Sequence, residues 1–209
     1  MNEHLSEQEL IRREKLQQLR ELNMEPYPAA LFPVSHYSAD IKQNFSEAEK
    51  EKFSHVTVAG RIMSLNDKGK VFFIRIQDSQ GYIQLYVRRD DICPSEDKTL
   101  FNQVLKHLID LGDIIGAHGF VFITKTGEIS VHVTQFVLLT KSLKPLPIVK
   151  RDESGHVFDA VTDPEFRYRQ RYADLIINPE TKQVFLQRTR LINTIRNFLN
   201  EKGAIEMET

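Results

Sequence analysis

The stretch "KVFFIRIQD", Lys70–Asp78, predicts a β-strand with two adjacent phenylalanines, and it decides the fold. Successive side chains of a strand point to opposite faces of the sheet. Phe72 therefore lies on the apolar face with the isoleucines of the stretch, whereas Phe73 falls on the polar face beside Arg75. An aromatic ring on a polar face needs a partner outside the core of its sheet.

Four more segments show the same period of two, at residues 55–65, 82–89, 113–124 and 128–139. Between the third and fourth of the five strands, apolar residues recur at helical spacing and Gly112 fits the position after a helix: Leu100, Val104, Leu108 and Leu111. Three strands, a helix and a hairpin are the order of an OB-fold, a five-stranded Greek-key barrel. We therefore predict a mainly β fold with α-helices.

Helices are predicted on both sides of the barrel. Ser6 and Glu9 form a capping-box pattern for an N-terminal helix, and Pro26 with the following proline should end it. Asp163, followed by a proline, begins a helical C-terminal region. Its longer helix ends at Gly203 and carries an apolar face made of Phe185, Ile192, Ile195 and Leu199. The last six residues, "AIEMET", begin to alternate like a strand.

Composition excludes several classes of protein. The net charge of the 209 residues is -1, so nucleic-acid binding would need a local set of side chains. Cys93 is the only cysteine, which excludes an intramolecular disulfide and disfavours a zinc site. The sequence has no phosphate-binding loop, no H-E-x-x-H pair, no signal peptide and no apolar run of membrane length. We expect a cytoplasmic protein without a metal site or a membrane partner.

The polar faces of the predicted strands gather a specific chemistry: Arg61, Phe73, Arg75, Gln84, Tyr86, Arg88, Glu128 and His132. An unstacked base is recognised by an aromatic ring against its face and by amide, carboxylate or guanidinium groups at its edge. OB-folds bind oligonucleotides around the second and third strands, where Phe73 and Gln84 fall. The pattern therefore fits binding of single-stranded RNA, without by itself choosing it over ordinary packing.

Structural roles compete with this interpretation. Phe73 could pack against a neighbouring loop or helix, and Tyr86 against the N-terminal helix. Arg75 and Arg88 could be solvated charges, and His132 could be satisfied by a neighbour. For Arg13 and Arg20, which lie beside the apolar stripe of the N-terminal helix, a solvated helix face competes with contact to an RNA backbone. The segment "EFRYRQRYADL" fits either a basic RNA patch or a salt-bridged interface helix.

Several segments together resemble the bacterial lysyl-tRNA synthetases, which belong to class IIb of the aminoacyl-tRNA synthetases. These segments include "HVTVAGRIMSL", "GKVFFIRIQDSQGYIQLYVRRDD" and "LGDIIGAHGFVFITKTGEISVHV". The succession of "TKTGE", "KPLP" and "RYRQRYADL" is the specific part, and the resemblance covers nearly the whole chain. The segment around "RDESGHVFDAV" is longer than the family leads us to expect.

The resemblance implies an enzyme that activates lysine with ATP and Mg²⁺ and then esterifies the 3′ end of tRNA(Lys). Its OB-fold domain would bind the anticodon stem-loop, whose central base is uridine. Phe73 resembles the stacking aromatic and Gln84 the edge-reading amide, while Arg61 and Glu128 resemble further base contacts. We expect RNA-backbone contacts from a second set: Arg13, Arg20, Arg75, Arg88 and His132. Arg88 stands where the family leads us to expect a small residue.

The family also implies a domain division: an N-terminal helix and linker (1–54), the OB-fold domain (55–143), an interdomain linker (144–162) and the start of the class II catalytic domain (163–209). "FLNEKGAIEMET" resembles the motif that forms the homodimer interface. The motifs that bind ATP and lysine would lie beyond Thr209. We therefore expect no catalytic residue, no bound ATP or Mg²⁺, and no formation of lysyl-adenylate by this chain.

Three alternatives stay open. The first is a part of an aspartyl- or asparaginyl-tRNA synthetase, which shares the barrel and the central uridine. The second is a free-standing OB-fold module that binds single-stranded RNA, and the third is a purely structural dimerisation domain. In none of these is DNA the expected partner.

Overall fold

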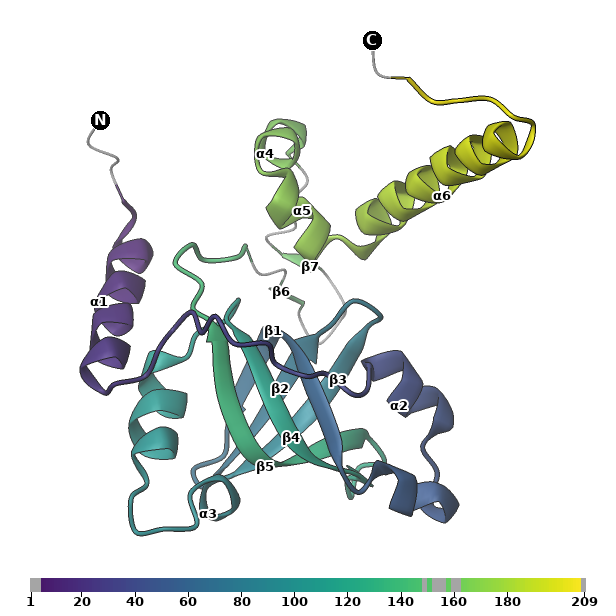
Figure 1. Cartoon of the computed structure of the whole chain (residues 1–209). Helices are drawn as coiled ribbons and strands as arrows, with labels where there is room; N and C mark the ends of the chain where they lie inside the picture. Colours follow the sequence, from purple (N-terminus) through teal and green to yellow (C-terminus); the bar gives the residue numbers. More distant parts are fainter. Residues whose placement is uncertain (1–4, 148–149, 152–156, 159–162, 208–209) are drawn as a thin grey trace. The chain divides into compact units, whose positions relative to one another are not determined.

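The structure is a computed structural model that describes residues 5–147, 150–151, 157–158 and 163–207. The chain forms two compact units, Met1–Pro145 and Leu146–Thr209, which are described separately. In the first unit five strands close into a barrel (Figure 1): β1 (Val56–Asp67), β2 (Val71–Gln77), β3 (Tyr82–Arg88), β4 (Ile114–Ile123) and β5 (Ile129–Thr140). The predicted OB-fold barrel is therefore confirmed.

The strand order around the barrel is β1-β2-β3-β5-β4. The β3–β5 pair is parallel, and the other four pairs are antiparallel. The helices of this unit are α1 (Glu7–Glu21), α2 (Ser38–Asn44), η1 (Glu47–Phe53), α3 (Arg89–Ile92) and η2 (Leu100–Leu108). In Figure 1, α1 and α2 lie on opposite sides of the barrel.

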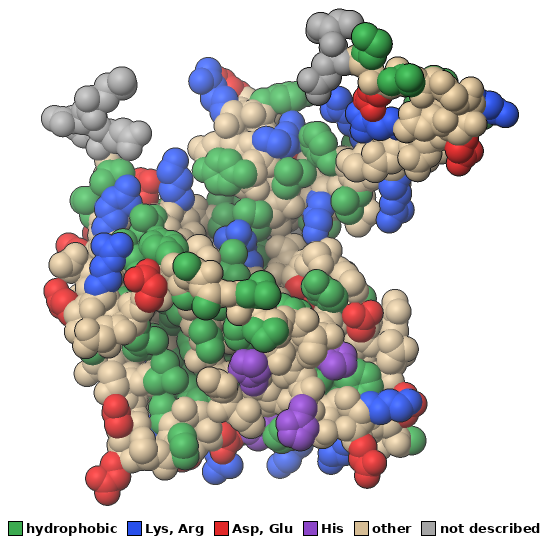
Figure 2. All heavy atoms as spheres, in the orientation of Figure 1, with side chains coloured by type: hydrophobic (Ala, Val, Ile, Leu, Met, Phe, Trp, Pro, Cys, Tyr) green, Lys and Arg blue, Asp and Glu red, His purple; other side chains and the backbone are tan. Residues whose placement is uncertain are grey.

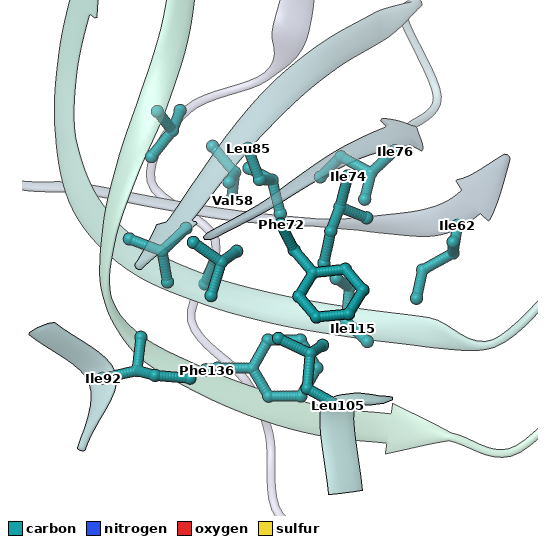
Figure 3. Close-up of a cluster of buried hydrophobic side chains, with 14 of the residues drawn as sticks. Val58, Ile62, Phe72, Ile74, Ile76, Leu85, Ile92, Leu105, Ile115 and Phe136 are labelled. Atoms are coloured by element: carbon teal, nitrogen blue, oxygen red, sulfur yellow. The ribbon is translucent and has the colours of Figure 1, made fainter. Parts of the chain in front are cut away.

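The inward faces of the strands form one hydrophobic core, with Phe72, Ile74 and Ile76 of β2 pointing into it (Figure 3). The ring of Phe72 lies 5.5 Å from that of Phe101, edge to face, so the helical segment η2 closes this side of the core. The backbones also approach closely, because a Cβ at Gly119 would lie 1.9 Å from the carbonyl oxygen of His132. Only glycine fits at that crossing.

The helix between β3 and β4 differs from its prediction. The segment η2 is a π-helix that ends at Leu108, so Leu111 and Gly112 lie outside it, in a turn. It buries Leu108 together with Phe101, Val104 and Leu105. The wider π-helical turn changes which side chains share a face, so the spacing of an α-helix missed two of these four residues.

The N-terminal helix α1 has the predicted capping box: the backbone N–H of Glu9 donates to Ser6 Oγ, and Glu9 Oε2 accepts from the backbone N–H of Ser6. The helix ends before Pro26, since Asn23 already adopts a positive φ of 56°. A left-handed residue of this kind stops a helix without a proline. The prediction that prolines end the helix is therefore wrong.

A buried ionic cluster fastens α1 to the barrel. Lys15 Nζ donates to Asp110 Oδ1 at 2.6 Å, and the guanidinium of Arg12 donates to two carbonyl oxygens, at Leu111 and Ser142, both at 2.9 Å. Lys141 Nζ joins the cluster through carboxylate oxygens of two aspartates. Burial acts to raise the pKa of Asp110, but hydrogen bonds from Lys141 and Lys15 outweigh it and hold this pKa below its ordinary value.

The segment before α2 lacks regular structure, as predicted, but is fixed on the barrel. The backbone N–H of Ser35 donates to the carbonyl oxygen of Thr57 at 3.0 Å, and the ring of Phe32 covers Gly116. The carboxylate of Asp78 accepts from the backbone N–H of Ser38 at 2.6 Å and from its hydroxyl at 2.7 Å. The sequence analysis predicted only a linker here and missed α2, because the bonds from Ser38 to Asp78 span 40 residues of the chain.

In the residues that the structure describes, the second unit has three helices and a short strand pair: α4 (Pro164–Arg169), α5 (Arg171–Ile177), α6 (Pro179–Glu201), β6 (Lys150–Arg151) and β7 (Val157–Phe158). Asp163 caps α4, as predicted, and Gly203 follows α6 with a φ of 85°. The apolar face of α6 is exposed in this chain. The predicted terminal strand is absent from residues 204–207, and residues 208–209 lie outside the described part.

The arginines of "EFRYRQRYADL" form ion pairs within the second unit. Asp174, which is fully buried, accepts from Arg167 Nε at 2.9 Å and also from Arg171. Arg169 pairs with Glu165 one helical turn away. The structure therefore favours the salt-bridged helix over the basic RNA patch. No helix in the described ranges is long and apolar enough to cross a membrane.

Candidate nucleic-acid interface

The outer face of the barrel is organised in two transverse rows that follow from the strand registers. One row is Arg75 (β2), Gln84 (β3), Ser130 (β5) and Phe122 (β4). The other is Phe73 (β2), Tyr86 (β3), His132 (β5) and Phe120 (β4). The residues that strand alternation placed on this face of β2, β3 and β5 are thus neighbours in space.

The second row forms an outer aromatic cluster with Phe122: Phe73, Tyr86, Phe120, Phe122 and His132. The ring centroid of Phe73 lies 5.5 Å from that of Tyr86. From its place on the polar face of β2 we expected the ring of Phe73 to be largely exposed. It is instead half-buried, because its direct cross-strand neighbour is another ring. A partly open face of Phe73 still points away from the core.

His132 is held by neighbours on both sides. Its ring stacks on that of Phe120 with centroids 4.7 Å apart, and its Nε2 lies 2.7 Å from Asp91 Oδ2. Tyr86 contacts the ring of His132 at 5.0 Å and lies in the aromatic cluster, whereas α1 packs on η2. The structural role weighed for His132 is therefore present, and the packing of Tyr86 under the N-terminal helix is not found.

Gln84 and Glu128 are joined through Ser130. The amide Nε2 of Gln84 donates to Ser130 Oγ at 2.9 Å, and Ser130 Oγ donates to the backbone carbonyl oxygen of Glu128 at 3.3 Å. The side chain of Glu128 is exposed at the turn between β4 and β5. Gln84 thus lies in the row next to that of Phe73, and Glu128 lies two residues before Ser130 at the adjoining turn.

Arg61 lies apart from Phe73. It pairs with Gln77 on β2, four residues along the strand from Phe73, and its Nη1 donates to the carbonyl oxygen of Gly112 at 2.7 Å. Burial lowers the pKa of its guanidinium, and the nearby charge of Asp113 opposes this effect. The structure thus gives Arg61 a structural hydrogen bond and leaves it half-buried near the end of the interface.

A register shift in β1 adds two polar residues that alternation missed. The register changes between Ile62 and Ser64, so Ser64 pairs with Arg75 and Asn66 with Phe73. Both are exposed on the outer face. A β-bulge inserts one extra residue and reverses the alternation beyond it. Serine and asparagine are common in turns, but at these positions they did not reveal a shift inside a strand.

Exposed cations lie within and beside the two rows, and others lie on α1. Arg75 lies with its Cζ 4.9 Å from the ring centroid of Tyr82, and Arg88 is exposed beyond Tyr86 at the end of β3. Lys68 and Lys70, in the turn between β1 and β2, are exposed near Arg88 and were not predicted. On α1, Arg13 and Arg20 are both exposed, whereas the unpredicted Arg12 is buried and fixes the helix.

Charged side chains of both signs are mixed on the face of the molecule that Figure 2 shows. On the face of the molecule shown in Figure 2, acidic and basic side chains are scattered around the rim of the barrel, and basic side chains lie along α1. No group of histidine, cysteine, aspartate and glutamate side chains in the described residues is arranged to hold a metal ion.

Two family models match the chain, one within each of its two units. Residues 56–139 match the model of an OB-fold nucleic acid binding domain, and residues 163–209 match that of the class II tRNA synthetases (D, K and N). The chain is 53% identical over 205 residues to a lysine–tRNA ligase of Porphyromonas gingivalis. Over nearly its whole length the chain is thus similar to a lysine–tRNA ligase.

Two further lysine–tRNA ligases are also similar to the chain. A lysine–tRNA ligase of Christiangramia forsetii is 50% identical over 207 residues, and one of Azobacteroides pseudotrichonymphae is 51% identical over 205. The matches cover 98–99% of this chain but only 35–40% of the three relatives. The chain thus spans about a third of the length of these lysine–tRNA ligases, and its matched OB-fold domain lies within that part.

Proposed function

We propose that the barrel binds the anticodon loop of tRNA(Lys), with the ring of Phe73 against the central base and the side chains of Gln84 and Glu128 at its edge. The observation that carries this proposal is the position of Phe73 on the outer face, in the row next to Gln84. Base–aromatic stacking supplies affinity and edge contacts supply discrimination. Arg61 would contribute from its position near the end of the interface.

The cations around the rows would contact the RNA backbone. Arg75 and Arg88 flank the position of Phe73 along the strands, and Arg13 and Arg20 extend the basic surface along α1. Such contacts position a ligand without reading its sequence, and salt weakens them. His132 would serve this interface through the aromatic cluster, since its Nε2 is already engaged by Asp91.

For the whole protein we propose the activity of its relatives, attachment of lysine to tRNA(Lys) with ATP and Mg²⁺ in the cytoplasm. In this assignment residues 1–54 brace the barrel, 55–143 bind the anticodon, 144–162 link the domains and 163–209 begin the catalytic domain. The exposed apolar face of α6 would then lie in a homodimer interface, because leaving large apolar side chains in water is unfavourable.

Replacing Phe73 by alanine should weaken binding of an anticodon stem-loop by about one to two orders of magnitude, since stacking is worth roughly 1–3 kcal/mol. The free energy of unfolding should fall by no more than about 1.5 kcal/mol, the contribution of one aromatic pair. A titration with labelled stem-loop, beside thermal melts, measures both. Phe73→Trp keeps a stacking ring and should retain affinity, whereas Phe73→Leu should not. Unchanged affinity of Phe73→Ala would contradict the proposal.

Replacing Gln84 by alanine should relax the discrimination between uridine and cytidine at the central position. An amide reads the base edge through hydrogen bonds, which differ between the two bases, while the stack on Phe73 tolerates both. The measurement is the ratio of the two dissociation constants, for stem-loops that differ only at this position. A ratio equal to that of the unaltered protein would show that Gln84 does not contact the base.

A further inference from the structure

Ser130 occupies an unusual place in the interface. It lies on the outer face of β5, yet none of its surface is exposed, and Gln84 and Phe122 flank it on the neighbouring strands. A buried hydroxyl group has to be hydrogen bonded. Ser130 Oγ meets this need twice, by accepting from Gln84 Nε2 at 2.9 Å and by donating to the carbonyl oxygen of Glu128 at 3.3 Å.

The direction of these two bonds is fixed by their chemistry. A serine hydroxyl has one hydrogen, and the carbonyl oxygen of Glu128 can only accept it. Ser130 therefore presents a lone pair toward Gln84, and only the nitrogen end of the amide can bind there. The Oε1 atom of Gln84 must then point away from Ser130, and no residue in the described part of the chain donates a hydrogen bond to it.

The orientation of this amide decides which base edge it fits. The two ends of a glutamine amide have nearly the same shape, so a free side chain can present either a donor or an acceptor. Uridine offers the donor N3–H, whereas cytidine offers an acceptor at N3 and a donor at its exocyclic amine. A fixed Oε1 accepts from N3–H of uridine and faces a second acceptor in cytidine.

We propose that Ser130 is a positioning residue that fixes the amide of Gln84 and thereby sets the preference for uridine over cytidine. This inference rests on the proposed function, because it needs a base at the edge of Gln84. It assigns to Ser130 no contact with the RNA. Its effect should therefore appear in discrimination between bases and disappear when Gln84 is removed.

The test uses the whole chain and two anticodon stem-loops, with U or C at the central position. Ser130→Ala removes the bond that orients the amide, so the ratio of the two dissociation constants should fall about five- to tenfold, the worth of one hydrogen bond. In the Gln84→Ala background, Ser130→Ala should change the ratio no further. Thr134→Val is the matched control, because Thr134 also lies on β5 and its hydroxyl also donates to a backbone carbonyl, that of His118 on β4, without touching Gln84.

The outcomes separate this inference from the function on which it rests. If Gln84→Ala lowers the ratio and Ser130→Ala does not, the role of Ser130 is refuted and anticodon binding stands. If neither Phe73→Ala nor Gln84→Ala affects binding, the proposed function itself fails. If Ser130→Ala unfolds, Ser130→Cys is the second variant, because it keeps the volume but weakens the hydrogen bond from Gln84. It should lower the ratio of the two dissociation constants in part. An unchanged ratio in this folded variant also refutes the inference.

Discussion

Replacing Lys141 by methionine is expected to lower the free energy of unfolding of the N-terminal unit by about 3–5 kcal/mol at neutral pH. The side chain of Lys141 is fully buried, and its Nζ lies 2.6 Å from Asp110 Oδ2 and 2.8 Å from Asp113 Oδ2. Asp113 has no exposed surface either. Methionine keeps most of the volume but removes the charge, so a buried carboxylate loses its partner.

The loss should depend on pH in a defined direction. Burial is the main influence on Asp113 and raises the pKa of its carboxyl, against the attraction of Lys141. Without Lys141 this pKa should rise further above its value in the unfolded chain. A carboxyl group whose pKa is higher in the folded chain stabilises the fold at pH values below its pKa in the unfolded chain, which is about 4. This stabilisation is lost as the pH rises. The destabilisation by Lys141→Met should therefore shrink on acidification toward pH of about 4.

Urea unfolding at a series of pH values measures this effect. Lys125→Met is the matched control, because Lys125 is exposed in the turn between β4 and β5 and should contribute little. Adding Asp113→Asn to Lys141→Met should recover part of the stability at neutral pH, since the unpaired charge is then removed. A loss below about 1 kcal/mol for Lys141→Met would mean that the cluster contributes little beyond its packing.

Replacing Phe72 by alanine should cost about 3–5 kcal/mol of unfolding free energy, because a large side chain leaves a cavity in a close-packed core. Phe72 is 4% exposed and packs edge to face on Phe101 (Figure 3). Its neighbour Phe73 gives the matched control, since Phe73→Ala deletes the same atoms on the outer face. We expect Phe72→Ala to lower stability, and Phe73→Ala to lower RNA affinity.

Thermal and urea unfolding of both variants, beside titrations with the anticodon stem-loop, measure this contrast. Phe72→Leu should lose less than Phe72→Ala, because leucine fills more of the cavity. The RNA titration of Phe72→Ala is made at a temperature where the variant stays folded. If Phe73→Ala proves to be the more destabilising of the two, the assignment of the two faces of β2 is reversed.

The sequence by itself determined the barrel and the faces of its central strands. The period of two in β2 and β3 fixed which side chains point outward, because a pleated strand has no other choice. Phe73 and Gln84 could therefore be placed together without coordinates. The capping residues Ser6 and Asp163 were equally readable, since a cap acts through backbone groups only a few residues away.

The tertiary structure alone decided what depends on residues distant in the chain. The bulge that brings Ser64 and Asn66 to the interface arises from pairing with β2, and the half-burial of Phe73 comes from Tyr86 across the strand. Arg12 is the buried arginine of α1, because it donates to carbonyl oxygens that lie 99 and 130 residues away in the sequence. The bond from Gln84 to Ser130 spans 46 residues. Local propensity cannot encode such partners, because the free energy that selects them comes from contacts that exist only in the closed barrel.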